Sequence, residues 1–118
     1  MANSVSWFEI TGKDGAKLQR FYGDLFGWKV DADNAMNYGM VEGGDGGIGG
    51  GIGQSQDGST QLTFYVSVDD PQAYLDKAEQ LGGRTVVPVT DIPDMVTFAQ
   101  FADPDGNVVG VFKSRQPS

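Results

Sequence analysis

Glu9 is the residue of this chain whose type and position most clearly allow chemistry. It lies in an apolar alternating segment, residues 4–11, which predicts a β-strand. If Phe8 and Ile10 pack under a helix, Glu9 points from the opposite face of the sheet. Burial of a carboxylate is costly unless it is paired or hydrogen-bonded. We therefore interpret Glu9 as a candidate catalytic base or anionic anchor; the alternatives are a solvated carboxylate or a structural link to Tyr65.

Aromatic and polar side chains are predicted to accompany Glu9. Trp7 shares its face, and a second strand at residues 62–68 places Thr63 and Tyr65 on the corresponding face. An internal repeat adds three further candidates for ligand binding: Met40, Gln100 and Phe112. Converging aromatic rings suit a planar organic ligand, through stacking and burial of area. The alternative is that these side chains fill a second core or build a dimer interface.

The composition excludes several kinds of chemistry. The chain has no cysteine and no histidine, so disulfides, thiolate catalysis, cysteine–zinc sites and Ser-His-Asp triads are absent. Sixteen acidic against eight basic residues give a formal charge of −8. This charge argues against nucleic-acid binding, whereas a cationic or neutral partner is easier to accept.

Length and hydropathy indicate one globular domain. The 118 residues, of which 39% are hydrophobic, are enough for a buried core. The first residues lack the pattern of a signal peptide, and no apolar run approaches the roughly 18 residues that span a bilayer. We expect a cytoplasmic protein without a membrane partner.

The candidate residues belong to an internal repeat. An offset of 56 residues matches Asp14 with Asp70 and Gly27 with Gly83, and beyond a loop around residues 91–94 the offset grows to 60. The larger offset matches Met40 with Gln100, Gly50 with Gly110, and Ile52 with Phe112. Each copy reads as a strand, an aspartate that caps a helix, the helix, and then further strands.

The helices and turns of the two copies follow from local patterns. The first helix, after Asp14, has the helical spacing of Leu18, Phe21, Tyr22, Leu25 and Phe26. The second begins at Asp70-Pro71, with Tyr74, Ala78 and Leu81 as its predicted inner residues. Strands are predicted near 28–32, 36–42, 84–89, 95–102 and 107–113, and Pro88 and Pro93 are expected to bound a loop. The glycine-rich segment 43–53 fits G-x-G-x-x-G but runs towards a strand, so we interpret it as close backbone packing or a mobile rim.

Specific runs in both copies resemble a known superfamily. They are Trp7-Phe8-Glu9-Ile10, Asp14, Phe21-Tyr22 and Phe26-Gly27-Trp28 in the first copy, and Val68-Asp69-Asp70-Pro71, Gly82-Gly83 and Phe101 to Asn107 in the second. These runs resemble the vicinal oxygen chelate superfamily, which contains glyoxalase I, bleomycin-resistance proteins and extradiol dioxygenases. The resemblance implies a single glyoxalase-like domain, residues 1–118, of the α+β class. Its two tandem βαβββ modules, about 1–54 and 61–118, would form a curved eight-stranded mixed sheet with helices on the outer face. It also implies a homodimer.

The resemblance further implies where a metal would bind. In metal-binding members, one ligand lies seven positions before the capping aspartate of each module, here Trp7 and Thr63. The second lies on the last strand of each module, here Gly50 and Gly110. Indole and glycine offer no side-chain ligand, so we expect no resident metal and no cofactor.

Three functions stay open. The first is metal-independent, glyoxalase/bleomycin-resistance-like binding of a small organic ligand, aromatic or cationic, in an acidic, aromatic-lined cup. The second is a metal-free lyase or isomerase of glyoxalase type, with Glu9 as general base and Tyr65 or Gln100 stabilising an enolate. The third is a protein-interaction or subunit module with a self-filled cup. We favour the first.

Overall fold

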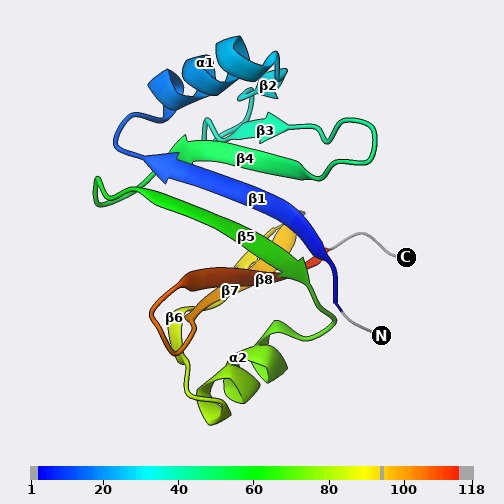
Figure 1. Cartoon of the computed structure of the whole chain (residues 1–118), viewed down its shortest axis with the longest axis vertical. Helices are drawn as coiled ribbons and strands as arrows, with labels where there is room; N and C mark the ends of the chain where they lie inside the picture. Colours follow the sequence, from blue (N-terminus) through cyan, green and yellow to red (C-terminus); the bar gives the residue numbers. More distant parts are fainter. Residues whose placement is uncertain (1–2, 94, 115–118) are drawn as a thin grey trace. The chain divides into compact units, whose positions relative to one another are not determined.

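The computed structural model describes residues 3–93 and 95–114, which form two compact units (Figure 1). The N-terminal unit comprises residues 6–63. The C-terminal unit comprises the described part of residues 64–114 together with residues 3–5. The segment before residue 6 is tied to the C-terminal unit by the Ser67 N–H, which donates to the Ser4 carbonyl at 2.9 Å.

The N-terminal unit is one βαβββ module. Its elements are β1 (Val5–Gly12), α1 (Gly15–Phe26), β2 (Val30–Asp31), β3 (Gly39–Val41) and β4 (Gly49–Gln54). The strands lie in the order β2-β3-β4-β1, with β1 and β4 parallel and the other pairs antiparallel. The helix begins as predicted, because the Asp14 carboxylate accepts from the Lys17 N–H at 3.1 Å, and it ends at Gly27 with φ of 72°.

The C-terminal unit repeats this plan. Its elements are β5 (Gln61–Ser67), α2 (Pro71–Gln80), β6 (Arg84–Ile92), β7 (Val96–Ala102) and β8 (Val108–Ser114). The strands lie in the order β5-β8-β7-β6, with β5 and β8 parallel. Asp70 caps α2 through the Ala73 N–H, and Pro71 occupies the first turn. The predicted α+β class and the paired βαβββ modules are confirmed.

Several predicted strand limits differ from the structure. β2 and β3 are shorter than expected, because Asn34 folds the chain between them into a hydrogen-bonded turn. The loop expected between Pro88 and Pro93 is wrong, since β6 continues to Ile92. The strand tolerates Pro88 because the β6–β7 register is irregular between Val87 and Thr90.

The core residues of α2 were only partly predicted. Leu75 is buried and packs with Val68, Ala99 and Val111, but the sequence pattern did not single it out. Leu81, predicted as an inner residue, is 71% exposed, because it lies just beyond the last helical residue, where the chain turns away.

The apolar spacing of α1 does not produce a fully buried face. Phe21, Leu25 and Phe26 are each more than half exposed, whereas Leu18 and Tyr22 are partly buried. The sheet beneath them offers little to cover the helix, because β2 has two residues, β3 has three, and much of β4 is glycine.

The pairing of strands corrects the sequence repeat by one residue. Glu9 pairs with Gly51 on β4, and Tyr65 pairs with Gly110 on β8. The position equivalent to Gly110 is therefore Gly51, not Gly50 as the sequence match predicted. By the same shift, Ile52 is equivalent to Val111 rather than to Phe112, and both of these residues are buried.

Candidate ligand-binding site

A chain of hydrogen bonds joins Trp7, Tyr38 and Glu9 on one face of the N-terminal sheet. The Trp7 indole Nε1 donates to the Tyr38 hydroxyl oxygen at 3.2 Å. The Tyr38 hydroxyl donates in turn to Glu9 Oε2 at 2.8 Å. All three side chains are half-buried. The carboxylate thus has the partner that its position in an apolar strand requires.

Glycines on β4 make room for this arrangement. A side chain at Gly51 or Gly53 would collide with the Tyr38 ring, and a Cβ at Gly49 would press against the Trp7 ring. The glycine-rich run predicted as close backbone packing therefore has a definite role in this strand. It lets the Tyr38 ring lie flat against the sheet, beside Glu9.

Asn34 positions Tyr38 from the turn before β3. Its side-chain Oδ1 accepts from the Tyr38 N–H at 3.0 Å, and its Nδ2 donates to the Tyr38 carbonyl at 2.7 Å. Asn37, between the two, has a positive φ of 52°. These contacts fix the backbone at the start of β3, and with it the direction of the Tyr38 side chain.

Met40 joins the same face of the sheet. It lies directly opposite Gly51 in the antiparallel β3–β4 pair, and Gly51 lies opposite Glu9 in the parallel pair. Directly paired residues share a face, so the half-buried Met40 side chain flanks the Tyr38–Glu9 pair. The expected grouping of Trp7, Glu9 and Met40 is thus present within one unit. We call these three residues and Tyr38 the N-terminal set.

Three of the other predicted residues, Tyr65, Gln100 and Phe112, form a second group in the C-terminal unit. Gln100 Nε2 donates to the Tyr65 hydroxyl at 2.7 Å, and these side chains are only 7% and 6% exposed. Phe98 and Phe112 contact the Tyr65 ring edge to face, with centroids at 6.3 and 6.4 Å. Thr63, also buried, is the last residue of the N-terminal unit, and strand alternation gives it the same face of β5 as Tyr65. A ligand-binding role for this group stays a prediction.

The two groups occupy equivalent positions but are built differently. Register and sequence offset match Glu9 with Tyr65, Tyr38 with Phe98, Met40 with Gln100, and Gly51 with Gly110. In the C-terminal unit a phenol and an amide form a buried neutral pair. In the N-terminal unit the Glu9 carboxylate and the Tyr38 phenol are half-buried, so this acidic pair is more exposed than the Tyr65–Gln100 pair.

Sequence reasoning missed Tyr38, which lies outside the segments singled out for chemistry. A usable signal existed: the offset of 60 residues matches Tyr38 with Phe98, a ring in the middle of a predicted strand.

The residues at the superfamily's metal positions do not fit a metal ion. With the corrected register, the positions on the last strands are Gly51 and Gly110, and the space beside each is filled by the ring of Tyr38 or Tyr65. Trp7 offers no ligand atom for a metal at its position. Among residues 3–93 and 95–114, no three His, Cys, Asp or Glu side chains are grouped so that they could hold a metal ion.

Comparison with known proteins places the chain in a family. The family model described as "Glyoxalase-like domain" matches residues 7–112, and the chain therefore belongs to this family, within the vicinal oxygen chelate superfamily. The resemblance seen in the sequence is confirmed. In the described part of the chain, no helix is both long and apolar enough to cross a membrane.

Individual relatives are more distant. The protein named "Putative glyoxylase CFP32" from Mycobacterium tuberculosis is 28% identical over 119 residues, which is 94% of this chain and 46% of that protein. Its counterpart from Mycobacterium bovis gives the same values. The chain thus spans about half the length of these curated relatives.

Solved structures confirm the fold. Methylmalonyl-CoA epimerase from Mycobacterium tuberculosis has a TM-score of 0.68 at 12% identity, covering 95% of this chain and 88% of the epimerase. A glyoxalase/bleomycin resistance protein/dioxygenase superfamily member from Vibrio splendidus has a TM-score of 0.62 at 16% identity, covering 96% and 100%. At these identities the likeness concerns the fold alone.

Proposed function

We propose that this glyoxalase-like protein binds a small aromatic or cationic organic molecule at the N-terminal set, without a resident metal. The observation that carries the proposal is the Trp7–Tyr38–Glu9 hydrogen-bond chain on a half-buried sheet face. It supplies two aromatic rings and one carboxylate within the same small area. Aromatic faces attract organic cations, and a carboxylate adds charge complementarity.

The second group belongs to the C-terminal unit, and the proposed site does not rest on it. Tyr65 and Gln100 are buried and hydrogen-bonded to each other, so we assign them the role of holding this face of the C-terminal sheet rigid. Phe112 is half-buried beside Tyr65 in the same unit.

A second candidate function is metal-free proton transfer at a carbon beside a carbonyl, with Glu9 as general base. The hydrogen bond from Tyr38 favours it, because a carboxylate in that role must be held in place. Both hydrogen-bond donors of this face are engaged within the chain, Trp7 Nε1 with Tyr38 and the Tyr38 hydroxyl with Glu9, so an enolate would accept from either only after that contact breaks. Deuterium exchange into methylmalonyl-CoA, the compound named by the similarly folded epimerases, would test it. We expect that any exchange is abolished by Glu9→Gln, and its absence with the unaltered chain would remove this candidate for that compound.

Native mass spectrometry of protein purified without added metal tests the proposed function. A retained organic mass at stoichiometric level, with no metal, is the expected result. A stoichiometric divalent metal would contradict the metal-independent part. A bare chain or bare dimer would shift the interpretation towards an interaction module, which the buried Tyr65–Gln100 pair would suit.

We also propose that the protein forms a homodimer. Phe21, Leu25 and Phe26 give α1 an exposed apolar surface, with side chains 57 or 58% exposed. Exposed apolar clusters of this kind are typical of protein interfaces. Light scattering after size-exclusion chromatography should give the mass of a dimer, and Phe21→Ser should shift it towards the monomer. A monomer for the unaltered chain would contradict the proposal.

A further inference from the structure

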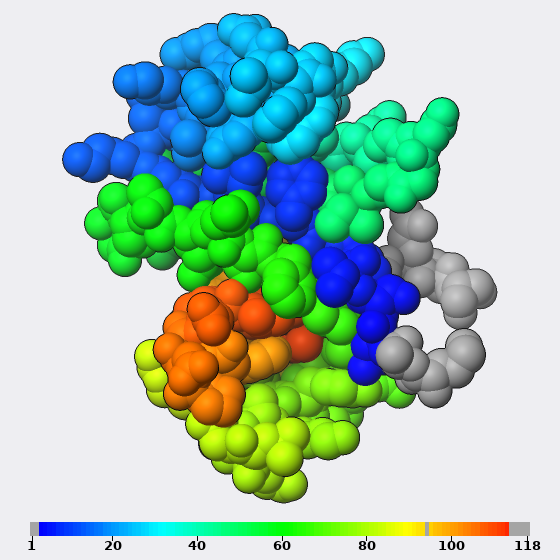
Figure 2. Space-filling model, viewed as in Figure 1, coloured from blue at the N-terminus to red at the C-terminus, as the bar shows by residue number. Residues whose placement is uncertain are grey.

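An apolar groove of about 370 Å³ lies between α2 and the C-terminal sheet. Its floor is formed by side chains that alternate with the Tyr65 group: Val66 on β5, Phe101 on β7 and Val111 on β8. Strand alternation therefore places the groove on the opposite face from Tyr65 and Gln100. Figure 2 shows a hollow bounded by α2 in yellow-green, β5 in green and the turn before β8 in orange.

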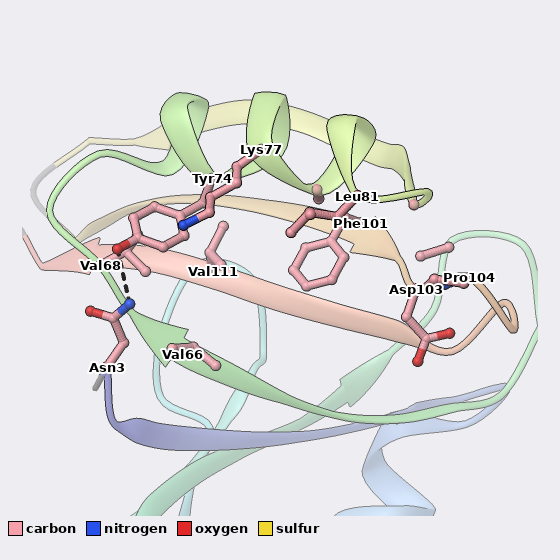
Figure 3. A pocket seen from close by; sticks show the side chains of 13 residues that line it. Asn3, Val66, Val68, Tyr74, Lys77, Leu81, Phe101, Asp103, Pro104 and Val111 are labelled. Carbon is pink, nitrogen blue, oxygen red and sulfur yellow. Dashed lines mark hydrogen bonds between the residues drawn. The ribbon is translucent and has the colours of Figure 1, made fainter. Parts of the chain in front are cut away.

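The volume suits a small molecule. Ligand pockets in proteins commonly hold about 300–1,000 Å³, and this groove lies near the lower limit. Ala78 and Leu81 line the groove on the side of α2, so both of its walls are apolar. Leu81 is labelled in Figure 3. A slender apolar chain matches this shape, because it gains most of its affinity from buried apolar area.

Two hydrogen-bond donors mark one end of the groove. Asn3 Nδ2 donates to the Tyr74 hydroxyl oxygen at 2.9 Å (Figure 3), which leaves the Tyr74 hydroxyl hydrogen available to donate to another group. Lys77 follows Tyr74 by three residues on α2, so the two side chains lie on the same helix face. Within the described structure, neither the Tyr74 O–H nor the Lys77 ammonium has an acceptor. The chemistry that complements this end is an acceptor group, best a carboxylate.

The opposite end offers no side-chain hydrogen-bond donor among the residues that line it. Pro104 closes it with an apolar ring. The neighbouring Asp103 carboxylate is occupied within its own turn, where it accepts from the backbone N–H groups of Asp105 and Asn107 and from Asn107 Nδ2. The groove is therefore apolar along its length, with side-chain donors at one end and the internally hydrogen-bonded Asp103 carboxylate at the other.

We propose that this groove is a second binding site, for a medium-chain aliphatic carboxylate. The carboxylate accepts hydrogen bonds from Tyr74 and Lys77, and the chain runs along Val66 and Val111 towards Pro104. This site is separate from the N-terminal set and does not depend on the function proposed for it.

Calorimetric titration with octanoate, decanoate and decanol tests the proposal. Each added methylene should tighten binding by about three- to fourfold until the groove is full. Decanol, which has the same chain without the charge, should bind several-fold more weakly than decanoate. Lys77→Gln should weaken decanoate by about fivefold and leave decanol unchanged, since it removes an exposed charge.

Two leucine variants on α2 distinguish binding in the groove from binding elsewhere on the surface. Ala78→Leu places a larger side chain inside the groove and should abolish decanoate binding. Ala73→Leu, an exposed position outside the groove, adds the same atoms to the same helix and should not. Circular dichroism checks that both variants fold. If decanoate fails to bind the unaltered chain at about 1 mM, or binds Ala78→Leu as well as Ala73→Leu, the proposal is overturned. Equal binding by the unaltered chain and Lys77→Gln would overturn the assignment of the carboxylate end.

Discussion

The Tyr38 hydroxyl donates a hydrogen bond to Glu9 at 2.8 Å, linking a turn residue to a carboxylate in the middle of β1. The two residues are far apart in the sequence and meet only because glycines on β4 leave space for the ring. This contact defines the acidic, aromatic part of the candidate site.

Tyr38→Phe keeps the ring but removes the donor to Glu9 and the acceptor for Trp7. We expect the free energy of unfolding to fall by about 1 kcal/mol, measured by urea denaturation. Tyr22→Phe is the matched control, because no described residue hydrogen-bonds its partly buried hydroxyl, and it should change stability much less. Equal effects of the two variants would mean that the Tyr38 hydrogen bonds add nothing to stability.

Gly51→Ala tests whether close packing of the Tyr38 ring requires glycine. The new Cβ would overlap the ring, so Tyr38 must move, at a cost of about 1–3 kcal/mol. Gly110→Ala should cost a similar amount through Tyr65. Gly44→Ala meets no atom within 4 Å and should stay within about 0.5 kcal/mol of the unaltered chain. A neutral effect of Gly51→Ala on thermal unfolding would contradict the packing described for this face.

Leu75→Ala, in the middle of α2, should be more damaging than Leu81→Ala at its C-terminal cap. Leu75 is 2% exposed in the C-terminal core, and its loss should cost about 2–5 kcal/mol. Leu81→Ala, at an exposed side chain, should cost well under 1 kcal/mol in the same chemical denaturation experiment. The reverse order would show that the sequence pattern, which favoured Leu81, was the better guide to the core.

The turn before β8 should respond to pH through Asp103. Hydrogen bonds from the Asn107 side chain and backbone, and from the backbone of Asp105 and Gly106, lower the pKa of this carboxyl below its ordinary value of 3.8. Because the folded-state pKa is lowered, the stabilisation is present above the unfolded-state pKa and is lost as the pH falls through the folded-state value.

Asp103→Asn should therefore destabilise the protein at neutral pH, and the difference from the unaltered chain should shrink below about pH 4. Asp105→Asn removes the same charge from the same turn without breaking a side-chain hydrogen bond of the described structure. A series of thermal melts between acidic and neutral pH should give a pH-dependent difference for Asp103→Asn that exceeds that of the control. If the two variants showed the same dependence of stability on pH, the hydrogen bonds to the Asp103 carboxylate would not be the cause of the pH response.

The fold could be predicted because local signals agree with the repeat. Asp14 and Asp70 cap their helices as expected, and the alternation around Glu9 and Tyr65 correctly assigned the faces of β1 and β5. These signals depend on neighbouring residues, which a single sequence displays directly.

The candidate site could be predicted only in part, because its remaining features depend on pairing between distant segments. The turn glycines Gly46 and Gly106 match at the larger repeat offset. In the strands that follow, however, the residue equivalent to Gly110 is Gly51, one position beyond the Gly50 that this offset predicts. A shift of one residue exchanges the two faces of a strand. Tyr38 was missed for a related reason. Its direction is set by the side chain of Asn34 and by the glycines of β4 that lie against its ring, Gly51 and Gly53.

Isothermal titration of benzyltrimethylammonium tests the central claim most directly, because this probe combines an aromatic ring with a cation. Benzoate, with the same ring and the opposite charge, serves as the control ligand. We predict that the unaltered chain binds the cation and not benzoate, and that Glu9→Gln weakens this binding by about tenfold. Glu42→Gln removes an exposed carboxylate of the same unit and should leave it unchanged. No binding by the unaltered chain, or equal binding by Glu9→Gln and Glu42→Gln, would contradict the account.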